Sequence, residues 1–156
     1  LAMKIFITKW IAAILLTMPL SIFADDVEDV MEVIEAYGDL EGDLVAQAEL
    51  MHPDRVYITQ GMRQTNESLN MRNQIATREA QEALNGGKTE FVTTIEDVDI
   101  SIHGDVAIAS FVRWWNVYPA NKAPVLGAPT WVSLVLIKEG SDWLIKHTHQ
   151  SPVRGG

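Results

Sequence analysis

Two histidines, His147 and His149, stand two residues apart near the end of the chain and are its strongest candidates for chemistry. They lie in segment 130–153, whose alternating apolar and polar residues predict two strands joined by a tight turn at 139–142. In the second strand both histidines share a face with Trp143, whereas the opposite face is polar. We therefore expect the histidines to point inward, toward a cavity.

The chemistry open to this pair has three interpretations. His147 or His149 could act as a general base, because an unperturbed histidine titrates near neutral pH. They could equally be hydrogen-bonded inside a polar cavity without any chemical role. A metal site would need a third ligand such as Glu96, Asp97 or His103, and none of these stands at a fixed spacing from the pair. We therefore expect neither a metal ion nor a cofactor.

Arg113 is the second candidate, because it stands in the middle of a predicted strand that otherwise looks buried. A buried guanidinium needs a partner, since an unpaired charge inside a protein is costly. If Arg113 faces the cavity, its planar group suits a carboxylate or phosphate on a ligand. Alternatively it pairs with Glu96 or Asp97 on the neighbouring strand, or lies exposed on the outer face. The alternating pattern does not decide between these.

Aromatic residues are frequent in the predicted sheet, and rings on its inner face would grip a flat organic ligand. Packing in the core and at a dimer interface is the alternative explanation. Trp114 and Trp115 are adjacent, so they must point to opposite faces. Together with Arg113 and the two histidines, the residues that we expect to line a ligand cavity are Tyr37, Tyr57, Trp131 and Trp143.

The elements that must position these residues follow from periodicity and turn signals. Helices are expected at 25–37, 44–51 and 65–84, and strands at 55–59, 89–102, 106–118 and in the final hairpin. A bulge is expected near Asp97, where the alternation becomes ambiguous. Segment 119–129 is a candidate flap. Helices followed by long strands predict an α+β fold: three N-terminal helices cover a cone-shaped, curved antiparallel sheet of about four long strands plus short ones.

The first 24 residues differ from the rest. Lys4 and Lys9 precede an apolar run, and residues 19–24 end at a plausible cleavage position. This order of parts predicts a signal peptide at 1–24, and the apolar run is shorter than the roughly 20 residues of a membrane-spanning helix. We expect an exported protein, periplasmic or secreted, whose single domain is residues 25–156.

Charge excludes several classes of partner. The chain carries a net charge of −9, and without residues 1–24 it has 10 basic and 21 acidic residues. Such an acidic chain without a basic cluster is a poor partner for nucleic acid or for an anionic membrane surface. It contains no cysteine, which removes thiol nucleophiles and thiolate–zinc sites.

The order of these elements and several short motifs resemble the nuclear transport factor 2-like superfamily. The matching pieces are Gly42–Asp43, residues 50–54 (LMHPD), Gly104–Asp105 and residues 143–151 (WLIKHTHQS). The chain most resembles the SnoaL-like branch and the association domain of calcium/calmodulin-dependent kinase II. The resemblance implies a cone with a pocket and frequent homodimers, but no single activity, because relatives include isomerases, dehydratases, cyclases and non-catalytic assembly domains.

Three functions remain open at this point. The first is an exported protein that binds a small organic ligand, carboxylate-bearing or aromatic, and forms a homodimer through the outer sheet face. The second is a lyase, isomerase or cyclase that uses His147 or His149 as its base. The third is a homo-oligomeric assembly domain without catalysis.

Overall fold

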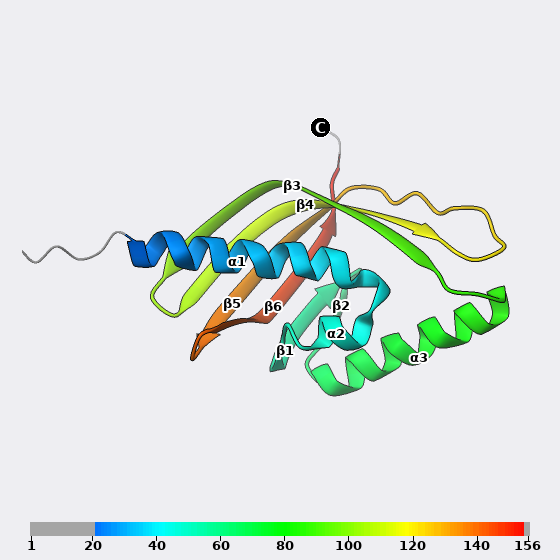
Figure 1. Cartoon of the computed structure of the whole chain (residues 1–156), viewed down its shortest axis with the longest axis horizontal. Coiled ribbons are helices and arrows are strands. Elements are labelled where there is room, and N and C mark those ends of the chain that lie inside the picture. The colour runs from blue at the N-terminus through cyan, green and yellow to red at the C-terminus, as the bar shows by residue number, and fades with distance from the viewer. Residues whose placement is uncertain (1–20, 155–156) are drawn as a thin grey trace, which may run out of the picture.

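A curved six-stranded sheet organises the chain in the computed structural model, which describes residues 21–154 (Figure 1). The strands lie in the order β2-β1-β6-β5-β4-β3. Along the chain the elements are α1 (Ser21–Asp39), the 3-10 turn η1 (Leu40–Gly42), α2 (Leu44–Ala48), β1 (Met51–Thr59), β2 (Met62–Gln64), α3 (Glu67–Asn85), β3 (Glu90–His103), β4 (Val106–Tyr118), β5 (Thr130–Glu139) and β6 (Asp142–Pro152).

The predicted α+β fold is confirmed, with helices on one side of a long-stranded sheet (Figure 1). Strands β3 to β6 form an antiparallel meander, as expected. Two features differ from the prediction. Strand β1 begins at Met51, earlier than expected, and pairs in parallel with β6. The short strand β2, which forms a hairpin with β1, was not predicted. Both depend on pairing partners that local periodicity does not reveal.

Local signals explain where the two later helices begin and end. The side chain of Asp43 accepts a hydrogen bond from the Ala46 amide and caps α2. The Asn66 side chain accepts one from the Leu69 amide at 3.0 Å and caps α3. Helix α3 then ends at Gly86, whose φ of 75° is readily adopted only by glycine.

Two bulges change the direction of side chains along the sheet. In β3 the pairing with β4 shifts between Glu96 and Asp99, and Asp97 takes a φ of 53°. The bulge predicted near Asp97 is therefore confirmed. In β6 a second, unpredicted bulge falls at Lys146, because Ile145 and His147 pair with consecutive residues of β5. A bulge shifts the alternation by one residue, so it exchanges the faces of every residue beyond it.

Helix α1 covers one part of the inner sheet face and forms the core with it (Figure 1). Val30 and Ile34 of α1 are fully buried against inward-facing strand residues such as Phe111, Leu134 and Ile145. Helix α3 makes its main contacts with β1 and α2. The apolar core therefore fills only the α1 side of the concave face, and the side nearer α3 is left open for a cavity.

The predicted signal peptide, residues 1–24, lies outside the described residues except for 21–24, the backbone of which begins α1. Within residues 21–154, no helix combines the length and the apolar character needed to cross a membrane.

The strained position in β3 gives a test of the fold. Replacing Asp97 by Val places a β-branched residue at positive φ, and we expect the free energy of unfolding to fall by about 1–2 kcal/mol. Asp97→Gly should leave it unchanged or raise it, because glycine adopts this conformation without a steric penalty. Urea unfolding followed by circular dichroism measures both. Asp99→Val, exposed on the same strand, is the control, and an equal loss there would rule out backbone strain as the cause.

Candidate functional site

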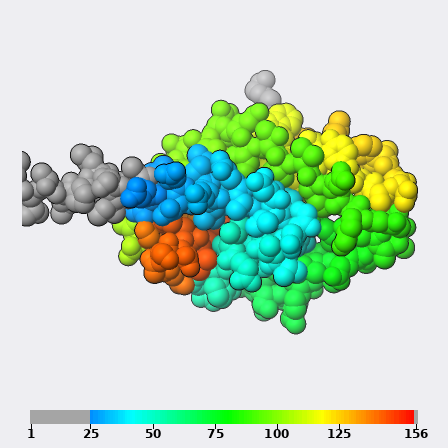
Figure 2. Space-filling view, in the orientation of Figure 1, coloured from blue at the N-terminus to red at the C-terminus, as the bar shows by residue number. Residues whose placement is uncertain are grey.

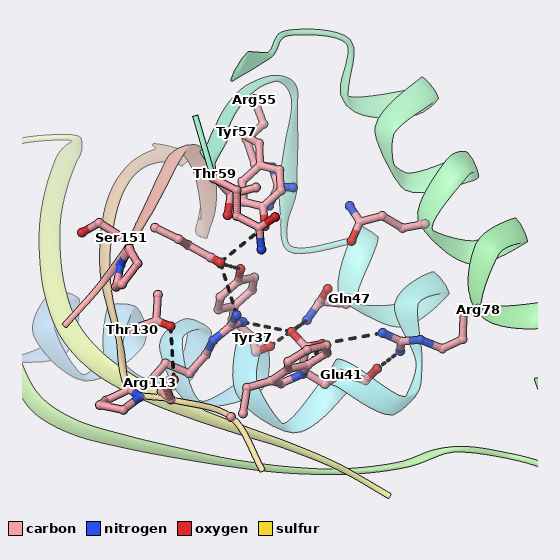
Figure 3. Close-up of a pocket in the computed structure, with 18 residues that line it drawn as sticks. Tyr37, Glu41, Gln47, Arg55, Tyr57, Thr59, Arg78, Arg113, Thr130 and Ser151 are labelled. Atoms are coloured by element: carbon pink, nitrogen blue, oxygen red, sulfur yellow. Dashed lines mark hydrogen bonds and ion pairs between the residues drawn. The ribbon is translucent and has the colours of Figure 1, made fainter. Parts of the chain in front are cut away.

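A cavity of about 500 Å³ opens on the concave side of the sheet, beyond the end of the α1 core (Figure 3). Its walls come from the end of α1, η1, α2, strands β1, β4 and β6, helix α3 and segment 127–130. The lining includes Tyr37, Glu41, Gln47, Arg55, Tyr57, Thr59, Gln60, Gln74, Arg78, Arg113, Trp115, Gly127, Ala128, Pro129, Thr130, Gln150, Ser151 and Pro152.

The buried carboxylate of Glu41 is the centre of the polar contacts in this cavity (Figure 3). Its Oε1 accepts from Arg113 Nη1 at 3.1 Å and from Gln47 Nε2 at 3.3 Å. Its Oε2 accepts from Trp115 Nε1 at 3.1 Å and lies 3.8 Å from Arg78 Nη2. Arg78 also donates to the Glu41 backbone carbonyl. One carboxylate therefore fixes two arginines and a tryptophan that come from α3 and β4.

A second set of contacts joins the two cavity tyrosines through Gln150. The Gln150 amide donates to the Tyr37 hydroxyl at 3.0 Å. Gln150 Oε1 accepts from the Tyr57 hydroxyl at 3.4 Å and from Arg113 Nη2 at 3.3 Å. Within residues 21–154 the Tyr37 hydroxyl donates to no protein group, and Arg113 Nε is buried without a partner. The Tyr37 hydroxyl therefore remains available to donate to a ligand, whereas Arg113 Nε has almost no accessible surface and is out of a ligand's reach.

Basic side chains outnumber acidic ones in the cavity lining, although the chain as a whole is acidic. Three arginines line the cavity (Arg55, Arg78 and Arg113) together with one carboxylate, Glu41. Arg55 is paired with the buried Glu67 at 2.9 Å. Three guanidinium groups against these two carboxylates leave one excess positive charge, in a protein whose net charge is −9.

Burial affects how two of the lining groups ionise. It raises the pKa of the Tyr57 phenol above its ordinary value of 10.0, and the nearby Tyr37 raises it further. The Tyr57 hydroxyl is therefore protonated, and a hydrogen-bond donor, at neutral pH. Burial lowers the pKa of Arg78 below its ordinary value, while Glu41 and Glu82 act in the opposite direction.

Segment 127–130 forms one wall of the cavity, beyond the turn at residues 119–122. Val125 pairs with Val117, and the Gly127 amide donates to Asn116 Oδ1, so both contacts hold the segment against β4. Gly127 passes so close to β4 that an added Cβ would lie 2.1 Å from the Trp115 carbonyl oxygen. The predicted flap is thus a packed wall in this part, and only glycine fits at its closest approach.

The expectation that His147 and His149 face the cavity is wrong. The bulge at Lys146 exchanges the faces of β6, so Thr148 and Gln150 point inward instead. His147 pairs with Val135 and His149 with Ser133, both on the outer face, and His149 is exposed. Neither histidine lines the cavity. The alternation was predicted correctly up to Ile145, and the extra residue reversed it.

The other predicted site residues divide into two groups. Tyr37, Tyr57 and Arg113 line the cavity together, and the open question about Arg113 is answered by its inward orientation and its pairing with Glu41. Trp131 does not line it, because it lies on the outer face and is 44% exposed. Trp143 points inward, as expected, but it is packed in the apolar core under α1.

Sequence reasoning missed the most connected residues of the site, Glu41, Gln150 and Arg78. Glu41 falls between the helices predicted at 25–37 and 44–51, and Arg78 lies within the helix predicted at 65–84, so no local pattern marks either residue as part of a site. Of the Trp114–Trp115 pair, Trp115 is the one that lines the cavity. No group of three or more His, Cys, Asp or Glu side chains in residues 21–154 is arranged to hold a metal ion.

The family is shown by a model of the SnoaL-like domain that matches residues 30–155. The chain therefore belongs to the SnoaL-like family, as the sequence motifs indicated, and it shares its fold with nuclear transport factor 2-like proteins. No curated protein sequence matches the chain.

Solved structures share the fold at low sequence identity. A nuclear transport factor 2-like protein from Salmonella enterica matches with a TM-score of 0.70 and 19% identity, over 86% of this chain and 96% of its own. A candidate dehydratase from Streptomyces avermitilis matches at 0.67 and 18%, over 85% and 99%. A candidate ketosteroid isomerase from Shewanella frigidimarina matches at 0.58 and 18%, over 77% and 92%. At these identities the likeness concerns the fold alone.

The role of Glu41 can be tested through stability. Glu41→Gln keeps the shape of the side chain but removes the charge that pairs with Arg113 and Arg78. We expect the free energy of unfolding to fall by about 3–5 kcal/mol, because buried guanidinium groups lose their counter-ion. Chemical denaturation measures the loss.

Two further variants control this experiment. Glu35→Gln, on an exposed position of α1, should change stability by less than about 0.5 kcal/mol. Adding Arg113→Met to Glu41→Gln should recover part of the loss, since the guanidinium that needed the charge is gone. A Glu41→Gln variant as stable as the parent would show that the carboxylate does not hold the site together.

Proposed function

We propose that this chain is a small-molecule-binding protein whose cavity holds an organic anion, such as an aromatic carboxylate. The observation that carries the proposal is the excess positive charge of a cavity inside an acidic protein. Its volume of about 500 Å³ is within the usual range of roughly 300–1,000 Å³ for ligand pockets. A local positive field would draw an anion toward the cavity.

The donors in the cavity suit an acceptor oxygen. The Tyr37 hydroxyl is an unused donor in the Gln150 network, which also holds the Tyr57 hydroxyl and Arg113 Nη2. The rings of Tyr37, Tyr57 and Trp115 supply apolar surface beside them. A flat ligand with one carboxylate or carbonyl group would satisfy both kinds of surface, because the oxygen meets the donors while the ring packs against the aromatics.

Binding can be tested with native mass spectrometry and titration. A mass excess of a few hundred daltons would reveal a ligand that co-purifies, and benzoate and 4-hydroxybenzoate serve as calorimetric probes. Tyr37→Phe should weaken binding by about tenfold, since one hydrogen bond to a charged group is lost.

Tyr118→Phe is the matched control, because Tyr118 is exposed and outside the cavity lining. Its affinity for the same probe should equal that of the parent. A protein that purifies without ligand and binds neither acid, or a Tyr37→Phe variant with unchanged affinity, would count against an anion site in this cavity.

A catalytic role is the second candidate, and two related structures carry names of candidate lyases or isomerases. The unused Tyr37 hydroxyl could stabilise a developing oxyanion. A general base is harder to assign. Among the described lining residues there is no histidine or aspartate, and the single carboxylate, Glu41, already receives several donors. This arrangement favours binding over catalysis. Export of the protein remains a separate prediction, made from residues 1–24.

We also propose that two copies of this chain pair through the outer face of the sheet. Several apolar side chains lie exposed on this face: Val92, Val106, Ile108 and Trp131. An uncovered group of this kind is typical of a protein–protein contact. A sheet face of one copy can meet the same face of another in a symmetric dimer.

The oligomeric state gives the test. Sedimentation velocity of the purified protein should show a dimer that Trp131→Glu shifts to monomer, because a charge at the centre of an apolar contact is not solvated. Val45→Glu changes a similarly exposed apolar residue on α2 and should leave the dimer intact. A parent protein that is monomeric at all concentrations would refute pairing through this face.

A further inference from the structure

A second cavity, of about 400 Å³, lies between α3 and the inner face of strands β3 and β4. It adjoins the first cavity, and Gln74, Arg78 and Trp115 contribute to both. In the space-filling view the surface is hollowed where α3 faces the strand β3 (Figure 2). The residues that line it are Gln64, Asn70, Asn73, Gln74, Thr77, Arg78, Gln81, Asn85, Thr89, Phe91, Trp115, Val117 and Pro119. We refer to it as the amide cleft.

Helix α3 turns its amide side chains toward the sheet and its leucines toward solvent, which is the reverse of the usual arrangement. All the amide side chains of α3 line the amide cleft: Asn70, Asn73, Gln74, Gln81 and Asn85. Asn70 and Asn85 are only 3% and 8% exposed, whereas Leu69 and Leu84 beside them are 44% and 79% exposed. A helix that served only to cover the sheet would bury its leucines and expose its amides. This arrangement therefore requires another explanation.

Much of the hydrogen-bonding capacity of these amides is unused. Within residues 21–154 the exposed side chains of Asn73 and Gln81 and the half-buried Gln64 make no hydrogen bond to protein, so they can bond a ligand in place of water. Asn85 Oδ1 is buried without a partner. Asn70 is engaged at both ends, since it donates to Glu67 at 3.4 Å and accepts from Gln74 at 3.2 Å. A buried polar atom without a partner costs free energy unless water or a ligand meets it.

Aromatic rings form the opposite wall of the amide cleft. Phe91 and Trp115 are stacked with their ring centroids 5.8 Å apart and their planes at 23°. The Arg78 guanidinium lies 4.0 Å from the Phe91 ring centroid and is already engaged by Glu41. No carboxylate contributes to the described lining. The cleft thus combines neutral donors and acceptors with aromatic surface, and its one charge is already paired.

We propose that the amide cleft binds a neutral polyhydroxylated ligand, namely a sugar ring of a mono- or oligosaccharide. Each hydroxyl both donates and accepts, and a carboxamide offers both functions in one group, so the two match without ionic partners. The C–H face of a pyranose supplies apolar surface for the ring of Trp115 or Phe91. A pocket of this volume accommodates a small ligand. The sugar site adjoins the anion site and shares Trp115 with it, but it depends on the amides of α3 rather than on Tyr37.

The experiment uses maltose and cellobiose as probes of the purified protein. Saturation-transfer NMR should show contact with at least one of them, and calorimetry should give its affinity. The double variant Asn73→Leu/Gln81→Leu should weaken binding by about tenfold or more, because each lost hydrogen bond contributes on the order of a factor of ten at most. Both positions are exposed, so the fold should tolerate the change.

Two controls make the result specific. Arg72→Leu, exposed on α3 and outside the amide cleft, should bind the sugar like the parent. Tyr37→Phe should also leave sugar binding unchanged, whereas it weakens benzoate binding, so failure of either site is recognised separately. The proposal is overturned if neither disaccharide shows saturation transfer, or if the Asn73→Leu/Gln81→Leu variant binds as tightly as the parent.

Discussion

The buried carboxylate of Glu41 is the constraint on which the polar half of the molecule depends. It lies in the 3-10 turn between the first two helices, and its partners come from α3 and β4. Without this charge, two guanidinium groups would lose their counter-ion in a poorly solvated space, and the Trp115 indole N–H would lose its acceptor. One short turn therefore links α3 to β4 across the space that the two cavities occupy.

Strand β4 shows how the concave face is divided. Its inward positions begin with Ala107, Ala109 and Phe111, which belong to the core beneath α1. The next two, Arg113 and Trp115, belong to the cavity. The inward side chains of β4 change from apolar to polar beside the end of α1, where the turn η1 carries Glu41. A single strand thus contributes to the core at one end and to the cavity at the other. The cavity lining carries an excess of basic groups because most acidic residues of the chain lie outside it.

Sequence reasoning predicted what is local. The three helices, the tight turn at 139–142, the bulge near Asp97 and the family itself all follow from short patterns of residues. The lining of the cavity was predicted only in part, since Tyr37, Tyr57 and Arg113 line it whereas His147 and His149 point outward. One bulge at Lys146, in a stretch without glycine or proline, reversed the faces of β6 and brought Gln150 inward. Glu41 meets partners more than 30 residues away, which no local spacing records.

The position of β6 has a consequence for how the molecule forms. This last strand lies in the middle of the sheet, where it pairs with both β1 and β5. Strand β1 is synthesised early, but apart from the short β2 it has no pairing partner until residues 145–150 of β6 are synthesised. Closing such a long loop costs chain entropy before any contact rewards it, and topologies of this kind fold slowly. The exposed edge of β1 is meanwhile open to wrong partners, so a nascent or truncated chain is the form most in need of a chaperone.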